Sequence, residues 1–459
     1  MSNVESEIDK KYIVILGGSN SILTKGLQFG IVQEAKKKLP NIEIKNLALG
    51  GCGSCQRLLE LIRHKNSNYF KNLEAIIIET NVNDIQHSQS FMNLDDVLLI
   101  YDDICRIISS FNCKVINLVL PFTNVKPNVS LINNYIISKS NEYGFNVIDI
   151  HQRFIVNKCL DFFGKYDHLH PLQPFMMKLG QEIVDNISSF HIIEKMNCET
   201  ASDYVEIYPN DLLHVSGDTL LEVDIKNSWF SEKAFKLSNT TKLKFPQKYY
   251  GYKIIGALIW NHDISKYDLS HYVYENHKHT LVKGFRGKDM IFQEIRNNFI
   301  VDDDTYFYYN NKCLNINERC KFVFVGDNPV VYKERYSKKG VESSDAKRVS
   351  IVCFLANKNI KANSLEMNRV NLIKDLIQNL VPKFDFSYLV PDPLYIMESI
   401  IEFNKKKDSK SNDKNNVKNL QKKIEDLEKK VRKQKSIIDN YANKRKLNIL
   451  LKIKKILKL

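Results

Sequence analysis

The sequence predicts an α/β protein: a parallel sheet covered by helices, followed by a β-rich, sandwich-like domain and a C-terminal coiled-coil helix. Three observations support this fold class. Short apolar runs alternate with helix-like stretches over 1–195, which is typical of a parallel sheet with helices on both faces. Short strand-like segments separated by turn residues dominate 200–357. Apolar residues then recur every three or four positions along 417–441, as they do in coiled coils.

The first domain, 1–195, is expected to alternate strands with helices. Several of its strands are rich in Val and Ile and apolar throughout, as strands buried on both faces of a sheet are. Right-handed crossovers place the C-terminal ends of such strands at one edge, so we expect a flavodoxin-like sheet. The strands are expected at 12–16, 42–49, 75–79, 114–120 and 146–150, and the helices near 21–38, 54–65, 93–111, 128–142 and 173–188.

The second domain, 200–357, is expected to be an antiparallel β module. Its strands are expected at 204–208, 220–225, 241–245, 252–260, 305–309, 321–325 and 348–354. Trp229 and Trp260 are of a type that stacks on sugars, but we interpret them as ordinary sandwich core. A helical connector, 358–404, follows with helices near 363–381 and 392–403.

The tail, 405–459, carries the whole net charge of +14, because it holds 20 Lys or Arg against 6 Asp or Glu. The remaining residues balance at 47 of each sign. The heptad seam at 417–441 predicts a homo-oligomer, and the basic amphipathic segment 447–459 suggests peripheral contact with a membrane. Nucleic acid is not the expected partner, because no aromatic residues are interleaved for base stacking.

Composition indicates a soluble chain, with 43% hydrophobic and 26% charged residues and no apolar run long enough to span a bilayer. The polar segment Met1–Lys11 does not look like a signal peptide. An odd count of 9 cysteines fits a reducing compartment, so we expect the cytoplasm, with contact at the inner membrane as an option. Cys52 and Cys55 form a CxxC pair, which we interpret as small packing groups rather than a redox or zinc site.

Polar or glycine residues follow three consecutive strands of the first domain. Ser19 comes directly after 12–16, Gly51 follows 42–49, and Asn83 follows 75–79. Parallel topology brings these positions to one sheet edge, where open α/β sheets bind ligands. Late in the domain comes the loop Asp167-His168-Leu169-His170-Pro171, in which Asp167 can orient the imidazole of His170.

These residue types fit acyl transfer. Ser19 is the candidate nucleophile and His170 the base that removes its proton. The backbone N–H groups of Ser19 and Gly51 and the side-chain amide of Asn83 are the candidate oxyanion donors. His168 is interpreted as a loop residue, and His64, His87 and His151 as surface or structural residues.

The order of these blocks resembles that of the SGNH (GDSL-like) hydrolases over about 10–190. The resemblance implies a serine esterase fold and assigns the oxyanion glycine to Gly51, with Gly50 one residue away as the alternative. Its blocks are Gly17-Gly18-Ser19, Asn46-Leu47-Ala48-Leu49-Gly50-Gly51, Asn81-Val82-Asn83-Asp84 and Asp167-His168-Leu169-His170-Pro171. Gly18 stands where the family has Asp, and Asn81 where it has Gly. Both are expected to line the entrance of the site and to affect substrate choice.

The resulting hypothesis is a serine-dependent ester hydrolase or O-acyl/O-acetyl transferase that forms an acyl-enzyme on Ser19. The Gly-Gly-Ser-Asn-Ser version of the first block resembles bacterial polysaccharide-associated members, so an acylated carbohydrate or glycoconjugate is the expected substrate. No metal or organic cofactor is expected. The alternative is a non-catalytic recognition module in a coiled-coil scaffold for surface-polysaccharide assembly.

Overall fold

The protein is described here by a computed structural model. It describes residues 10–90, 92–123, 128–160, 164, 167–195, 203–262, 269–286, 290–295, 299–309, 323–325, 328–331, 348–358 and 380–392. The predicted coiled coil at 417–441, the terminal helix at 447–459 and most of the predicted helical connector lie outside these residues. None of the helices within the described residues combines the length and apolarity that crossing a bilayer requires.

The first domain contains an all-parallel sheet in the order β19-β5-β4-β3-β1-β2. Without β19, the order is β2-β1-β3-β4-β5, which is the flavodoxin-like order that was predicted. The chain crosses over in opposite directions from β1, so the switch point of the sheet lies between β1 and β3. The strands are β1 Lys11–Leu16, β2 Ile42–Asn46, β3 Leu73–Ile78, β4 Lys114–Val119, β5 Asn146–Asp149 and β19 Phe384–Asp385.

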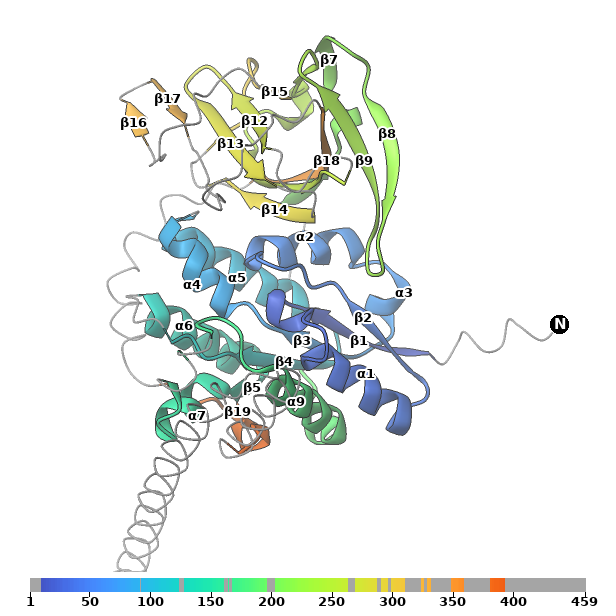
Figure 1. Cartoon of the computed structure of the whole chain (residues 1–459), viewed down its shortest axis with the longest axis vertical. Helices are drawn as coiled ribbons and strands as arrows, with labels where there is room; N and C mark the ends of the chain where they lie inside the picture. The colour runs from blue at the N-terminus through green and yellow to red at the C-terminus, as the bar shows by residue number, and fades with distance from the viewer. Residues whose placement is uncertain are drawn as a thin grey trace, which may run out of the picture.

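Helices cover both faces of this sheet (Figure 1). Helices α1 and α9 pack together on one face, and α2, α5 and α6 cover the other. The described helices are α1 Leu27–Lys38, α2 Ser54–His64, α3 Asn68–Lys71, α4 Asn81–Ser90, α5 Leu94–Ile108, α6 Asn128–Tyr143, α7 Ile150–Val156 and α9 Gln173–Asp185. Helices α3, α4 and α7 were not predicted.

Two glycines allow α1 and α9 to approach closely. A Cβ atom on Gly30 would collide with the carbonyl oxygen of Met177, and one on Gly180 with that of Leu27. Since α1 follows the Ser19 turn and α9 follows the loop that carries His170, this contact holds the two loops in a fixed relation.

Strand β19 was not predicted. Phe384 pairs with Asn146 and Asp385 with Val147, so the chain returns after the β-rich module to add a sixth parallel strand to the first sheet. Ser387 in the short helix η6, Ser387–Leu389, accepts a hydrogen bond of 2.8 Å from the backbone N–H of Asp149. The segment predicted as a connector therefore includes part of the first domain's sheet.

The β-rich module has two sheets, which agrees with the predicted β-rich class. One has the order β16-β17-β13-β12-β15-β10-β7, and the other has the order β14-β11-β18-β9-β8 with β6 paired to β18. The module's strands are β6 Tyr204–Ile207, β7 Leu213–Ser216, β8 Leu221–Lys226, β9 Ser231–Ser238, β10 Lys242–Lys244, β11 Lys253–Trp260, β12 Leu269–Glu275, β13 Thr280–Arg286, β14 Met290–Glu294, β15 Tyr306–Tyr309, β16 Val323–Val325, β17 Asn328–Val331 and β18 Arg348–Asn357.

The module packs directly on the helices of the first domain, with β14 above α2 in Figure 1. The apolar core of the first domain continues into the module through Trp260, Met290 and Phe292. Trp260 is therefore core, as expected, whereas Trp229 lies in the β8–β9 turn with 46% of its surface exposed, so its prediction as core was wrong. A turn tip has no facing layer to cover a side chain.

Candidate active site

Ser19 lies in a tight turn directly after β1, in the short helix η1, Ser19–Ser21. The buried carboxylate of Glu79 at the end of β3 accepts hydrogen bonds from the Gly18 N–H at 2.8 Å and from Ser21 Oγ at 3.2 Å. A Cβ atom on Gly18 would collide with Oδ1 of Asn83. The turn therefore needs glycine at this position because a neighbouring side chain fills the space.

Ser19, His170 and Asp167 form a hydrogen-bonded chain. Ser19 Oγ lies 2.8 Å from His170 Nε2, and His170 Nδ1 lies 2.9 Å from Asp167 Oδ2. The other carboxylate oxygen of Asp167 accepts the N–H groups of Leu169 at 2.8 Å and His170 at 3.1 Å. All three sequence-predicted residues are thus brought together, with the carboxylate held from both sides.

The carboxylate and the imidazole are partly open to solvent, with 43% of the Asp167 side chain and 30% of the His170 side chain exposed. Burial works to raise the pKa of Asp167, but the hydrogen bonds from Leu169 and His170 outweigh it and lower the pKa. An ionised Asp167 accepts from Nδ1–H of His170 and leaves Nε2 free to take the hydroxyl proton of Ser19.

The second block supplies the loop between β2 and α2. Asn46 donates through Nδ2 to the carbonyl of Ser21 at 2.9 Å, and its Oδ1 accepts from the N–H of Ala48. A Cβ atom on Gly50 would lie 4.0 Å from the Cβ atom of Ser19, so this loop passes beside the nucleophile. Gly51 has a φ of +72°, the left-handed region that favours glycine. Both candidate oxyanion glycines thus belong to the loop beside Ser19.

Asn83 reaches the site from the first turn of α4, Asn81–Ser90, which directly follows β3. Its position beside Gly18 places its amide next to the Ser19 turn. Asn81 does not line the entrance. It is buried, and it donates to the Leu120 carbonyl at 2.8 Å and accepts the Leu120 N–H at 3.1 Å, which joins the ends of β3 and β4.

Two functional neighbours were missed by the sequence analysis. Glu79 is fully buried, and burial raises the pKa of its carboxyl against the opposing charge of Arg57. Arg57 is also fully buried, and its guanidinium donates to the carbonyls of Cys52, Gly53 and Glu79. An acidic residue at the end of an otherwise apolar strand was the available signal for Glu79.

The other histidines and the CxxC pair have structural surroundings. Cys52 and Cys55 are free, buried thiols. Burial raises the pKa of Cys52 to about 12, and it also raises the pKa of Cys55 well above its usual range. Such thiols are inert as nucleophiles, which agrees with packing groups. His168 bonds to Thr123 Oγ1 at 2.8 Å and lies outside the Ser19–His170–Asp167 chain.

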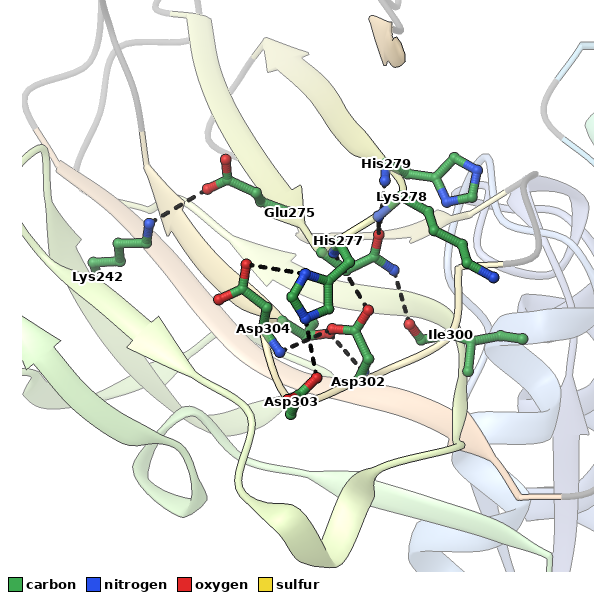
Figure 2. A network of polar contacts seen from close by, with 11 residues as sticks. Lys242, Glu275, His277, Lys278, His279, Ile300, Asp302, Asp303 and Asp304 are labelled. Carbon is green, nitrogen blue, oxygen red and sulfur yellow. Dashed lines mark hydrogen bonds and ion pairs between the residues drawn. The ribbon is translucent and has the colours of Figure 1, made fainter. Parts of the chain in front are cut away.

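A second cluster of titratable residues lies on the β-rich module (Figure 2). The His277 ring stands between Asp303, 3.1 Å from Nε2, and Asp304, 3.7 Å from Nδ1. Asp302 accepts the backbone N–H groups of His277 and Asp304, as turn-capping acids do. Over the described ranges, no group of three or more His, Cys, Asp or Glu is arranged to hold a metal ion. The cluster therefore joins two turns of the module.

No model of a known protein family matches the chain, and no curated protein matches it. Solved structures are similar to about two-fifths of it. A lipase/acylhydrolase from Enterococcus faecalis is 17% identical over 39% of this chain and 97% of its own, with a TM-score of 0.32. The acetyl xylan esterase AlAXEase is 13% identical over 39% and 98%, with a TM-score of 0.32. An acetylxylan esterase from Geobacillus stearothermophilus is 13% identical over 39% and 92%, with a TM-score of 0.31.

Proposed function

We propose that this chain is a serine-dependent ester hydrolase or O-acyl/O-acetyl transferase, with Ser19 as nucleophile, His170 as general base and Asp167 as the residue that orients it. The observation that carries the proposal is the unbroken hydrogen-bonded chain from Ser19 Oγ through both ring nitrogens of His170 to Asp167. The hydroxyl can attack a carbonyl carbon, the imidazole can take the hydroxyl proton, and the carboxylate can orient the imidazole.

In the first step, Ser19 Oγ attacks the ester carbonyl carbon while its proton passes to His170 Nε2. The oxyanion of the tetrahedral intermediate is met by donors beside Ser19, for which the Ser19 N–H, the loop at Gly50 and Gly51, and the Asn83 amide are the candidates. The intermediate collapses when the C–O bond to the alcohol breaks and His170 returns the proton to the leaving oxygen. The acyl group then stays on Ser19.

In the second step, water or a sugar hydroxyl attacks the acyl-enzyme and gives its proton to His170. Water gives hydrolysis and a sugar hydroxyl gives transfer, and both use the same residues. We propose an acylated carbohydrate or glycoconjugate as substrate, because the Gly17–Ser21 segment resembles that of polysaccharide-associated family members.

The test is turnover of p-nitrophenyl acetate by the wild type, Ser19→Ala, His170→Ala and the matched control His168→Ala. The two site variants are expected to lose about 1000-fold or more in kcat, whereas His168→Ala, whose ring bonds to Thr123, keeps wild-type turnover. Labelling of Ser19 by an organophosphonate is expected only when His170 is present. A folded wild type that is neither labelled nor active would favour the alternative, a recognition module within a scaffold.

We also propose that 417–441 makes the protein a homo-oligomer and that 447–459 contacts anionic membranes. Deleting 405–459 is expected to reduce the mass of the assembly and abolish liposome binding, while hydrolysis of a small ester persists. Unchanged mass together with unchanged liposome binding would contradict this proposal.

A further inference from the structure

The loop between β2 and α2, residues 47–53, is fixed on one side by the first domain. Its Leu49 N–H donates to the Gly17 carbonyl at 3.0 Å, directly before the Ser19 turn. Gly50 lies against Ser19, and Arg57 binds the carbonyls of Cys52 and Gly53. A displacement of this loop would therefore move backbone groups next to the nucleophile.

On its other side, the same loop is held by strand β14 of the β-rich module. Glu294 Oε1 lies 2.9 Å from Nδ1 of His87 on α4, and Nε2 of His87 lies 3.1 Å from the Gly51 carbonyl oxygen. Two residues earlier on β14, the Phe292 N–H donates to Sγ of Cys52 at 3.3 Å. One strand of the module thus reaches two consecutive residues of the loop.

The protonation of His87 follows from its two hydrogen-bond partners, the carboxylate of Glu294 and the carbonyl of Gly51. A carbonyl oxygen only accepts, so Nε2 must carry a hydrogen towards Gly51. An ionised carboxylate also only accepts, so Nδ1 carries a second hydrogen towards Glu294, and the ring is an imidazolium. His87 and Glu294 are 5% and 4% exposed, so the ion pair is shielded from water.

The surroundings of the pair agree with this assignment. Burial works to lower the pKa of His87, but the charge and hydrogen bond of Glu294 outweigh it and raise the pKa. Burial works to raise the pKa of Glu294, and His87 outweighs it and lowers the pKa. The other titratable groups facing the pair are Asp84 on α4, Arg57 on α2, Lys283 on β13 and the neutral thiols of Cys52 and Cys55.

Gly53 allows the loop to approach the side chains of Asp84 and His87 on α4 closely. A Cβ atom there would lie 2.7 Å from Asp84 Oδ1 and 3.0 Å from His87 Nδ1, so any other residue would push both side chains away. Asp84 in turn accepts the Ser54 N–H at 2.7 Å and the Ser54 hydroxyl at 2.6 Å. The start of α2 is thereby held to the same helix, α4, that carries His87.

We propose that Glu294 of the β-rich module is a positioning residue for the ester chemistry: through His87 it holds the Gly51 carbonyl and so fixes the loop that faces Ser19. This inference rests on the proposed function. The module then completes the active site, because the loop beside the nucleophile has its outer support on β14.

The test compares Glu294→Leu, Glu294→Gln and the matched control Lys253→Leu in the full chain. Leucine removes the partner of Nδ1. Glutamine can donate its amide hydrogen to Nδ1 of a neutral His87 whose Nε2 still donates to Gly51, so it restores the link without the charge. Lys253→Leu breaks another contact between module and first domain, the 3.0 Å pair with Asp96, which does not touch the loop.

Two readouts are measured: hydrogen exchange of the amides in 47–58, and kcat and KM for p-nitrophenyl acetate. Glu294→Leu is expected to speed exchange in this segment and to lower kcat by about 10- to 100-fold with little change in KM, because donors beside Ser19 lose their alignment. Glu294→Gln is expected to recover most of the loss, and Lys253→Leu to behave as wild type in both readouts.

The inference is overturned if Glu294→Leu keeps wild-type exchange in the loop and wild-type kcat, or if Lys253→Leu loosens the loop equally. If Glu294→Leu does not fold, His87→Gln is used in its place. The ring of His87 donates to Glu294 and to the Gly51 carbonyl from opposite sides, and a single glutamine amide group cannot donate at both positions. A wild type without Ser19-dependent turnover would count against the proposed function alone, because the exchange measurement still decides whether Glu294 holds the loop.

Discussion

Replacing Arg63 with methionine is expected to destabilise the whole protein strongly, because this residue joins α2 to two strands of the β-rich module. Its Nε lies 2.8 Å from Glu206 on β6, and its Nη1 and Nη2 lie 3.1 Å and 2.5 Å from the two carboxylate oxygens of Glu232 on β9. The Arg63 side chain is 9% exposed, and Glu60, one turn before it, is 1% exposed and 3.8 Å away. Methionine would fill most of the volume but leave the carboxylates of Glu206 and Glu232 without the guanidinium that pairs with them.

The expected loss is about 3–5 kcal/mol in the free energy of unfolding, the range for removing one partner of a buried ion pair. The assay is denaturant unfolding of the wild type and Arg63→Met, followed by the double variant with Glu232→Gln, which should recover part of the loss. The control is Lys233→Gln, which breaks the pair with Glu222 on the same hairpin. Because those side chains are 65% and 45% exposed, less than about 1 kcal/mol is expected. If Arg63→Met costs no more than this control, the buried network does not hold the two domains together.

Three further predictions concern the first domain. The pKa of Asp167 is lowered, so the hydrogen bond from His170 to the ionised carboxylate is fully present above the ordinary carboxyl pKa of 3.8 and is lost as pH falls through the lowered value. At neutral pH the carboxylate is therefore in place in the wild type. Asp167→Asn removes it and should reduce kcat for p-nitrophenyl acetate about 10⁴-fold. In Gly18→Ala the new methyl group should push the Asn83 amide aside. We expect kcat to fall about 100-fold, measured by turnover, and the free energy of unfolding to fall by about 1–3 kcal/mol, measured by denaturation. A near-normal kcat would exclude Asn83 as an oxyanion donor. Burial raises the pKa of Asp149 from 3.8 to about 6, so its stabilising contribution is present below the unfolded pKa and is lost as pH rises through the folded one. Asp149→Asn should therefore unfold like the wild type near pH 4 but be about 2–3 kcal/mol more stable near pH 8.

The parallel sheet could be predicted because its strands are buried on both faces. The clearest cases are the central strands β1, Lys11–Leu16, and β3, Leu73–Ile78, each of which ends in four consecutive buried apolar residues. Strand β19 could not be predicted in the same way. It has two residues, and its place is decided by pairing with Asn146 and Val147, more than two hundred residues earlier in the chain. Local pattern carries no information on such a partner.

The candidate site was predicted where chemistry and chain order coincide, as at Ser19 and at the loop with Asp167 and His170. Asn83 was predicted only to follow the strand at 75–79, and the helix that carries it, α4, was not predicted. This helix begins at Asn81, whose side chain joins β3 to β4. Glu79 and Arg57 were missed because a buried charge is defined by its neighbours. The carboxylate of Glu79 meets the Gly18 N–H, and this contact exists only after β1 and β3 pair.

The boundary between the two domains is where the sequence was least informative and where the structure says most about the site. His87 on α4 and Glu294 on β14 lie 207 residues apart in the chain, so their pairing forms only when the module docks on the first domain. Buried charges without partners are unfavourable, so the arrangement in which these pairs close is preferred over other dockings of the module. That docking also places Phe292 and Trp260 in the core of the first domain. A module tethered loosely for substrate capture would gain nothing from such burial. The docking observed here instead agrees with the proposed role of β14 as the outer support of the loop beside Ser19.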